Sequence, residues 1–315
     1  MEIRKAISTD LPGILAVLKK SLGETSSQKT EAVWNYKHVQ NPFGESLVLV
    51  ACINDTIVGV RAFMRWKWQL KAEIFSVFRA VDTATDPDYQ GKGIFKKLTL
   101  EALKVAKEEG DNFVFNTPNA QSKPGYLKMG WQEVDKINLF IRLANPINYF
   151  SKVEYPEYKI HVKCSDDKLN RLLEKYNEYI KKKSKLYTPK NRAFLKWRYE
   201  ENKLQNYQVY YCQDLYMAVY IKSRGNLNEL RVSECIFISD KGKNLARQLL
   251  KTWNNYFKAN FISYNLNSKT LFRMSLEGNY GPMLTFKEIQ FKKIEESFFL
   301  NLQNWSYSLG DLELF

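Results

Sequence analysis

The chain has 315 residues, of which 44% are hydrophobic, and a formal net charge of +14. This length suggests two domains, and the apolar content suffices for a packed core, so wholesale disorder is excluded. No stretch approaches the roughly 18 uncharged apolar residues of a membrane-spanning helix, and no secretory signal follows Met1. We therefore expect a cytoplasmic protein without membrane insertion.

The first half predicts an alternation of helices and strands. A strand over 2–6 is followed by a helix that Thr9 or Asp10 can cap. Beyond it we expect a helix over 31–39, a turn over 41–44, strands over 46–53, 57–66 and 68–85, a helix over 94–109, a strand over 113–115, a short helix within 119–129 and a strand pair over 131–143. This order predicts an α+β fold with a mixed sheet.

The second half repeats this order. A Trp-x-Tyr sequence at a helix end precedes a strand pair in both halves, at 34–36 and at 197–199. A Thr-Asp or Ser-Asp pair, at 85–86 and at 239–240, precedes a helix in both. Helix–strand patterns also resemble one another by chance, but we interpret the halves as two copies of one α+β unit, over 1–148 and 149–315.

Few cysteines and histidines limit the chemistry that the chain can carry. The four cysteines are widely spaced, and the histidines are His38 and His161, so we expect no metal site. A Ser-His-Asp group would have to use one of these two imidazoles. The positive charge suits nucleic acid, an acidic membrane, a polyphosphate ligand or simple solvation, and composition does not separate these.

The segment Gln90-Gly91-Lys92-Gly93-Ile94-Phe95 lies between a predicted strand and a predicted helix. Its glycines let consecutive backbone N–H groups point into one concavity, and the helix N-terminus adds partial positive charge. This combination favours a pyrophosphate. The segment lacks the third glycine of a Rossmann fingerprint, and it is no P-loop because Gly93 follows Lys92.

The segment resembles the Gln/Arg-x-x-Gly-x-Gly/Ala signature of the GNAT acyltransferase superfamily, with Phe95 in place of the usual small residue. A second family element, Asn-x-x-Ala-x-x-Phe-Tyr-x-x-x-Gly-Phe, is similar to residues 119–131, where Asn119, Tyr126 and Gly130 match. The resemblance covers residues 1–145. It implies two tandem GNAT-like domains, each a mixed, mostly antiparallel β-sheet flanked by helices. The second half lacks the motif's second glycine, so we expect one working acyl-CoA site.

The resemblance implies acetyl-CoA or another acyl-CoA as co-substrate. The implied contacts are Thr83, Ala84, Thr85, Gln90, Gly91, Lys92, Gly93, Ile94, Phe95, Asn119, Ser122 and Tyr126. The backbone N–H of Thr83 would stabilise the developing oxyanion, and Tyr126 would protonate the departing thiolate. The alternative for Tyr126 is a packed core aromatic.

The attacking amine must lose a proton, so the resemblance also implies a general base or a water chain. Asp82 is one candidate, since partial burial could raise the pKa of its carboxyl group. A structural carboxylate paired with Arg79 or Arg61 is the alternative. His38 is the second candidate, with a surface histidine as its alternative.

Aromatic residues beside arginines suit an acceptor with a stacking ring and phosphates. We expect the acceptor side to include Trp34, Tyr36, His38, Asn41, Arg61, Arg79, Trp197 and Arg198. By resemblance to bacterial enzymes that acylate amino sugars for surface polysaccharide, a nucleotide-linked amino sugar is the expected acceptor. The same aromatics could form inter-domain core.

Other functions stay open at this point. They are a protein, peptide or small-amine N-acetyltransferase and a non-catalytic acyl-CoA sensor. We expect no nucleic acid partner, and a monomer or a homodimer.

Overall fold

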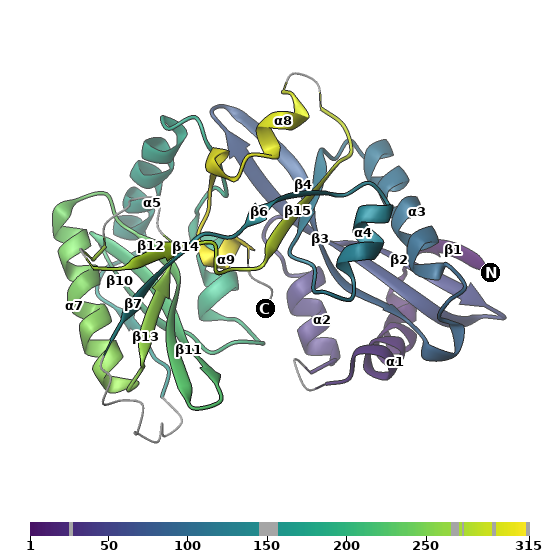
Figure 1. Cartoon of the computed structure of the whole chain (residues 1–315), viewed down its shortest axis with the longest axis horizontal. Coiled ribbons are helices and arrows are strands. Elements are labelled where there is room, and N and C mark those ends of the chain that lie inside the picture. The colour runs from purple at the N-terminus through teal and green to yellow at the C-terminus, as the bar shows by residue number, and fades with distance from the viewer. Residues whose placement is uncertain (25–27, 145–156, 266–270, 273, 292–293, 313–315) are drawn as a thin grey trace.

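The computed structural model describes residues 1–24, 28–144, 157–265, 271–272, 274–291 and 294–312. These residues form two mixed β-sheets, each flanked by helices, which lie side by side along the long axis of the molecule (Figure 1). The expected domain boundary near residue 148 falls within 145–156, outside the described residues.

The first sheet has the strand order β1-β2-β3-β4-β5-β15-β6. Its strands are β1 (Glu2–Lys5), β2 (Leu47–Ile53), β3 (Thr56–Leu70), β4 (Glu73–Thr85), β5 (Phe113–Asn116), β15 (Met283–Glu288) and β6 (Gln132–Lys136). The helices of this half are α1 (Leu11–Leu22), α2 (Glu31–His38), α3 (Ile94–Glu108) and α4 (Lys123–Lys128). They confirm the predicted order over the first 129 residues. Trp68, expected to open the next strand, belongs instead to β3.

Local sequence explains several element ends in this half. Asn54 and Asp55 adopt φ angles of 48° and 63°, as a two-residue hairpin turn between β2 and β3 requires. Pro12 lies in the first turn of α1, where its missing N–H costs no hydrogen bond. The Thr30 side chain accepts a hydrogen bond from the Val33 N–H and so caps α2.

The second sheet has the strand order β14-β7-β13-β12-β11-β10-β8. Its strands are β14 (Leu276–Gly278), β7 (Leu139–Leu143), β13 (Phe261–Tyr264), β12 (Leu227–Ile236), β11 (Leu215–Arg224), β10 (Gln208–Cys212) and β8 (Ile160–Val162). The other elements of this half are α5 (Asp166–Lys181), β9 (Leu186–Tyr187), α6 (Arg192–Leu195) with the π-helical turn Lys196–Glu200, α7 (Asp240–Tyr256), α8 (Glu296–Phe299), β16 (Trp305–Ser306) and α9 (Leu309–Leu312). Sequence reasoning missed α5 and β12.

The two halves exchange strands between their sheets (Figure 1). The second half also adds the short strands β9 and β16 to the first sheet, where β9 pairs with β3 and β16 pairs with β9. β7 leaves the first half and pairs with β13, whereas β15 leaves the second half and lies between β5 and β6. The expected strand pair over 131–143 is therefore wrong as a pair, because β6 and β7 enter different sheets. The two exchanged segments of the chain cross where Ile137 N donates to Pro282 O and Gly281 N donates to Ile137 O, both at 2.9 Å.

The predicted repeat is visible in the pairing of the strands. The run β2-β3-β4 is antiparallel, and after α3 the chain returns as β5, parallel to β4. The run β10-β11-β12 is also antiparallel, and after α7 the chain returns as β13, parallel to β12. The parallel return requires a crossover helix, which both halves supply.

A large apolar cluster spans both halves. Trp66 of β3 contacts Phe194 of α6, with ring centroids 5.5 Å apart, and Trp68 contacts Trp305, with centroids 4.9 Å apart. The halves therefore share core packing instead of meeting at a polar surface.

Candidate active site

The fourth strand of the first sheet separates from its parallel neighbour halfway along its length. β4 and β5 pair only over Val77–Arg79 and Phe113–Phe115. Beyond Arg79, β4 continues to Thr85 paired with β3 alone. The backbone N–H and C=O groups on its unpaired side can accept an extended ligand as an added strand, although Thr85 O already accepts from Gln90 Nε2 at 3.3 Å.

A β-bulge marks the point of separation. Arg61 of β3 pairs with Thr83 and Ala62 pairs with Val81, so Asp82 is the extra residue on β4. Asp82 accordingly has a φ of 39°, in the left-handed region. The bulge directs the Asp82 side chain towards α2, away from the run of strand pairs.

The glycine loop opens α3 without a side-chain cap. Gly91 and Gly93 have φ angles of 75° and 74°, which glycine adopts without steric cost. No side chain accepts from the first N–H groups of α3, which begins at Ile94. A Cβ atom at either glycine would meet no described atom within 4 Å, so both glycines border open space. This is the geometry of an anion site at a helix N-terminus.

Lysines balance the acidic residues beside this loop. Lys20 Nζ lies 2.8 Å from Asp86 Oδ1 and 2.6 Å from Asp88 Oδ2. The hydrogen bond from Lys20 lowers the pKa of Asp86. Lys92 lies 4.7 Å from the centroid of the Tyr89 ring. The loop therefore presents amides and a lysine to an incoming anion, while its own carboxylates are engaged.

Tyr126 lies buried beside the gap and hydrogen-bonds to Arg61. Arg61 Nη1 donates to the Tyr126 hydroxyl at 2.7 Å and also to Thr83 Oγ1. Tyr126 is 4% exposed, and its ring is T-shaped to that of Phe95, with centroids 5.6 Å apart. A Cβ atom at Gly125 would lie 2.9 Å from the Phe95 ring. The larger residue at position 95 is therefore accommodated by a glycine in α4.

Asn119 and Ser122, two expected cofactor contacts, bond to each other. Asn119 Oδ1 accepts from the Ser122 N–H and from the Ser122 hydroxyl, each at 2.9 Å. Asn119 is exposed and Ser122 is half-buried, at the start of α4. In this structure they order the turn that presents Tyr126.

The structure brings the two base candidates into direct contact. His38 Nε2 lies 2.9 Å from Asp82 Oδ2, and Lys37 Nζ also donates to this carboxylate. The expected partners of Asp82, Arg79 and Arg61, are thus replaced by two residues of α2. His38 is also no surface histidine, because it is 3% exposed.

The hydrogen bonds define the protonation of this group. Burial alone would raise the pKa of Asp82, but the charge of Lys37 and the hydrogen bond from His38 hold it well below its ordinary value. The expectation of a raised pKa is therefore wrong. Burial lowers the pKa of His38, so its imidazole is neutral at pH 7. Because the ionised carboxylate only accepts, Nε2 carries the hydrogen, and Nδ1 accepts from the Ser46 hydroxyl at 2.9 Å.

Two hollows meet at His38. One is a cleft of about 580 Å³ between the chain ends of β1 and β2 and the helices α1 and α2, and its lining includes Trp34, His38 and Ser46. The other is small and is lined by His38, Lys37 and Asp82 among others. Sequence reasoning missed Lys37 and Ser46. Lys37 could have been noticed as the neighbour of His38, whereas nothing in the sequence marks Ser46.

Three expected acceptor contacts are buried, and two of them, Tyr36 and Trp197, pack against each other between the halves. The Tyr36 hydroxyl donates to Trp197 O at 2.6 Å, and Trp197 Nε1 donates to Tyr36 O at 2.8 Å. Their rings stack with centroids 5.5 Å apart. Asn41 is 4% exposed and donates to Arg65 O at 2.7 Å.

Two further expected acceptor contacts hold the C-terminal segment. Arg79 donates to Asp311 O at 3.1 Å and to Leu312 O, and Arg198 Nε donates to Gly310 O at 3.1 Å. Both guanidinium groups are about 1% exposed. Of the eight expected contacts, Trp34 and His38 line the cleft.

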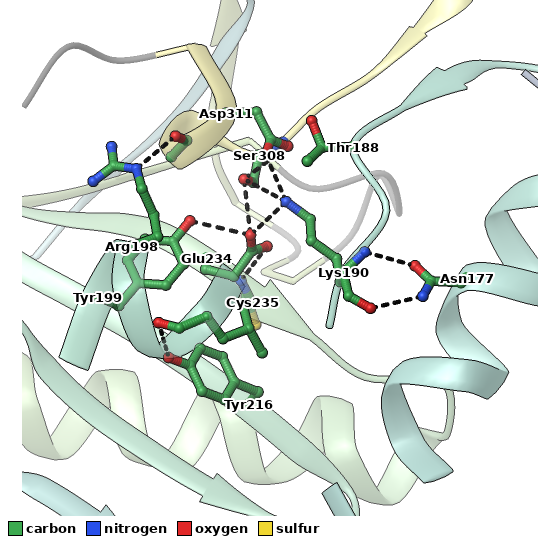
Figure 2. Close-up of polar contacts among 12 residues, drawn as sticks. Asn177, Thr188, Lys190, Arg198, Tyr199, Tyr216, Glu234, Cys235, Ser308 and Asp311 are labelled. Carbon is green, nitrogen blue, oxygen red and sulfur yellow. Dashed lines mark hydrogen bonds and ion pairs between the residues drawn. The ribbon is translucent and has the colours of Figure 1, made fainter. Parts of the chain in front are cut away.

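A buried ionic network lies next to these arginines. Figure 2 shows Lys190 between Asp311 and Glu234, with Nζ–O distances of 2.6 and 2.8 Å. Ser308 and Tyr199 also bond to Glu234, at 3.0 and 3.1 Å. The network joins β12 of the second sheet to the C-terminal segment.

Within the described ranges, no three His, Cys, Asp or Glu residues lie close enough together to hold a metal ion. Over the same ranges, no helix combines the length and the apolarity that a membrane crossing requires.

Comparison with known proteins finds a family model that is similar to the first half. Residues 2–134 match the family described as acetyltransferase (GNAT) domain. No curated protein matches the sequence.

Solved structures share the fold of nearly the whole chain. A probable N-acyltransferase of unknown function from Enterococcus faecalis is 8% identical, with a TM-score of 0.66 over 91% of this chain and 72% of that one. A GCN5-related N-acetyltransferase from Anabaena variabilis is 10% identical, with a TM-score of 0.63 over 92% and 73%. Eis1 from Mycobacterium abscessus is 11% identical, with a TM-score of 0.57 over 95% and 75%. These likenesses confirm the predicted fold class, mixed sheets flanked by helices.

Proposed function

We propose, from the premise that residues 2–134 form an acetyltransferase (GNAT) domain, that this protein is an acyl-CoA-dependent N-acyltransferase. One observation carries the proposal. The half of β4 that is paired on one side only, with β3, leads directly into a glycine loop whose amides open α3 without a side-chain cap. A long thioester with an amide-containing arm and a pyrophosphate matches both features at once.

The acyl donor would bind through main-chain groups. Its pantetheine amides would pair with β4 over Thr83, Ala84 and Thr85, in the gap that β5 leaves. Its pyrophosphate would bind the N–H groups of residues 91–95, where the helix dipole favours negative charge. Acetyl-CoA is the simplest such donor.

The chemical step would be direct attack of an amine on the thioester carbonyl. The backbone N–H of Thr83 would hold the oxygen on which negative charge develops. As the C–S bond breaks, Tyr126 would give its hydroxyl proton to the sulfur. Tyr126 is suited to this role because it lies beside the gap between β4 and β5.

The amine proton would leave through the contact between Asp82 and His38. Asp82 is ionised and His38 is neutral at pH 7, and both pKa values are lowered, so the pair would hold this proton only in passing. The hydrogen bond from Ser46 to His38 Nδ1 leads on to the larger cleft, where water can take the proton. Lys37 keeps the carboxylate charged between turnovers.

We propose a small-molecule amine as the acceptor, with a nucleotide-linked amino sugar as the first candidate. The support is the partly buried Trp34 ring in the cleft wall, which is tilted against His38 with ring centroids 4.1 Å apart. An aromatic ring in a cleft wall can stack with the nucleobase of such an acceptor. A thiol-release screen with acetyl-CoA would compare such sugars with peptides and polyamines. Turnover with peptides alone would refute the sugar as acceptor.

Binding of the donor is tested by thermal stability. Acetyl-CoA at 100 times its Kd should stabilise the protein by about 2.7 kcal/mol, because a ligand of the folded state shifts the unfolding equilibrium. Gly93→Val should abolish the increase in Tm, since a side chain there blocks the amides. Gly110→Val is the matched control, because Gly110 also has a positive φ, 88°, and open space around it, but lies at the other end of α3. An unchanged ligand effect in Gly93→Val would place the donor elsewhere.

A further inference from the structure

Arg61 is a buried positive charge without an anionic partner. Its side chain is 0% exposed and lies against the rings of Phe63, Phe95 and Tyr126, with Cζ 4.6, 5.7 and 5.1 Å from their centroids. Among the described residues, no carboxylate lies within 4 Å of it, and its Nε and Nη2 atoms have no hydrogen-bond partner. Burial of such a charge is costly unless something compensates it.

Several other cations of the chain with low exposure lie against carboxylates. Lys190 contacts two carboxylates, and Arg192 contacts Glu200 through two hydrogen bonds of 2.6 and 2.8 Å. Arg65, four residues along the same strand, pairs with Asp111. Arg61 differs from these three cations, and a negative charge arriving with a ligand would compensate its charge.

The position of Arg61 shows where that negative charge would arise. Arg61 lies opposite Thr83, on the part of β4 that is not paired with β5. Its Nη1 donates to the Tyr126 hydroxyl, so this oxygen acts as an acceptor. No hydrogen bond from the hydroxyl to another described residue is present, which leaves its proton free for a group bound in the gap.

We propose that Arg61 is a positioning residue for the leaving group of the transfer reaction. It holds Tyr126 with the hydroxyl proton directed towards the thioester sulfur, and its charge stabilises the negative charge that passes from sulfur to phenol oxygen. The C–N bond forms as the C–S bond breaks, the sulfur takes the Tyr126 proton, and the phenolate regains a proton from water. The inference rests on the proposed acyl-transfer function.

A double-mutant cycle tests the coupling of the two residues. Arg61→Met and Tyr126→Phe should each lower kcat with acetyl-CoA by on the order of 100-fold, and leave KM within about twofold, because both act after binding. The double variant should be no slower than the slower single variant. Arg61→Met should keep or raise Tm, since it removes an uncompensated charge. Fully additive losses, or an unchanged kcat in Arg61→Met, would overturn the proposal.

A binding measurement tests, without turnover, whether the Arg61 charge stabilises a negative charge on the CoA sulfur. At pH 8.5, wild-type protein should bind CoA about tenfold more tightly than desulfo-CoA, which lacks the sulfur, because the thiolate meets the Arg61 charge. Arg61→Met should bring the two Kd values together. Lys67→Met, which removes an exposed charge from the same strand, should keep the wild-type ratio. Equal Kd values in the wild type would contradict the role of Arg61, whereas failure to bind either compound would contradict the acyl-transfer function itself.

Discussion

At the scale of single residues, one extra residue in a strand organises the polar side of the site. The bulge at Asp82 turns a carboxylate out of β4 towards α2. There it meets His38 and Lys37, which are adjacent in sequence and both largely buried. A carboxylate, an imidazole and an ammonium group in contact form a unit whose protonation depends on all three.

The protonation of His38 should appear in the pH dependence of stability. Burial lowers the pKa of His38 from the ordinary 6.5, so below this pH the imidazole is protonated more in the unfolded chain than in the folded chain. The free energy of unfolding should therefore fall as the pH drops below about 6.5. The Asp82 carboxylate, whose pKa is also lowered, adds to this loss below about pH 4. The neighbouring charges that face the imidazole are Lys37 and Asp82.

We predict that His38→Gln flattens the decrease in stability between pH 6.5 and 5. The wild-type slope should exceed that of the variant by up to about 1.4 kcal/mol per pH unit, the value for one proton. Urea unfolding at several pH values measures both slopes. His161→Gln is the control, because His161 is partly exposed on β8. If the free energy of unfolding depended on pH equally in wild type and His38→Gln, His38 would have the same pKa in the folded and unfolded states, which would contradict the prediction.

At the scale of elements, the exchange of β7 and β15 depends on one close crossing. A Cβ atom at Gly281 would lie 2.7 Å from Ile137 Cβ and 2.8 Å from Ile137 O. The crossing therefore requires glycine for reasons of space, not of backbone angle. Since β15 lies between β5 and β6, a displaced crossing would disturb the first sheet next to Phe115.

We predict that Gly281→Ala destabilises the protein by about 1–3 kcal/mol, through overpacking against Ile137. Gly23→Ala is the comparison, because Gly23 has open space and should cost only the strain of its φ of 65°, about 1 kcal/mol. Chemical denaturation gives both values. Equal losses in the two variants would show that the crossing relaxes without cost.

At the scale of the whole molecule, the C-terminal segment joins the two sheets. Arg79 of β4 and Arg198 of the second half hold its carbonyl groups, and Lys190 holds Asp311 and Glu234 (Figure 2). A Cβ atom at Gly310 would collide with the Tyr199 hydroxyl, so the segment fits closely. Because of the exchanged strands and the packed C-terminal segment, each half lacks part of its structure when the other half is absent.

We therefore predict that the chain unfolds in one cooperative transition and that Lys190→Met destabilises it strongly. Removing one partner leaves Asp311 and Glu234 buried without a counter-charge, which costs about 3–5 kcal/mol. Lys181→Met is the control, since its ion pair with Glu178 is exposed and should change stability by less than about 0.5 kcal/mol. Two separate transitions, or a loss in Lys190→Met as small as in the control, would contradict the shared structure.

Local patterns were enough to predict much of this protein from its sequence. The hairpin at Asn54-Asp55, the α3 helix and the glycine loop were predicted because backbone preferences and apolar periodicity act within a few residues. The order of elements in the two halves and the motif over 90–95 then indicated the fold and the donor site. Asp82, His38 and Tyr126 were proposed as site residues from the same resemblance.

Tertiary structure alone decided which distant residues meet. The exchange of β7 and β15, the contact of Asp82 with His38 and Lys37, and the burial of Arg61 against Tyr126 depend on strand register and on pairing between remote segments. Sequence periodicity fixes which face a residue takes, but not which strand lies beside it. For that reason the lowered pKa of Asp82 and the uncompensated charge of Arg61 became visible only in the folded chain.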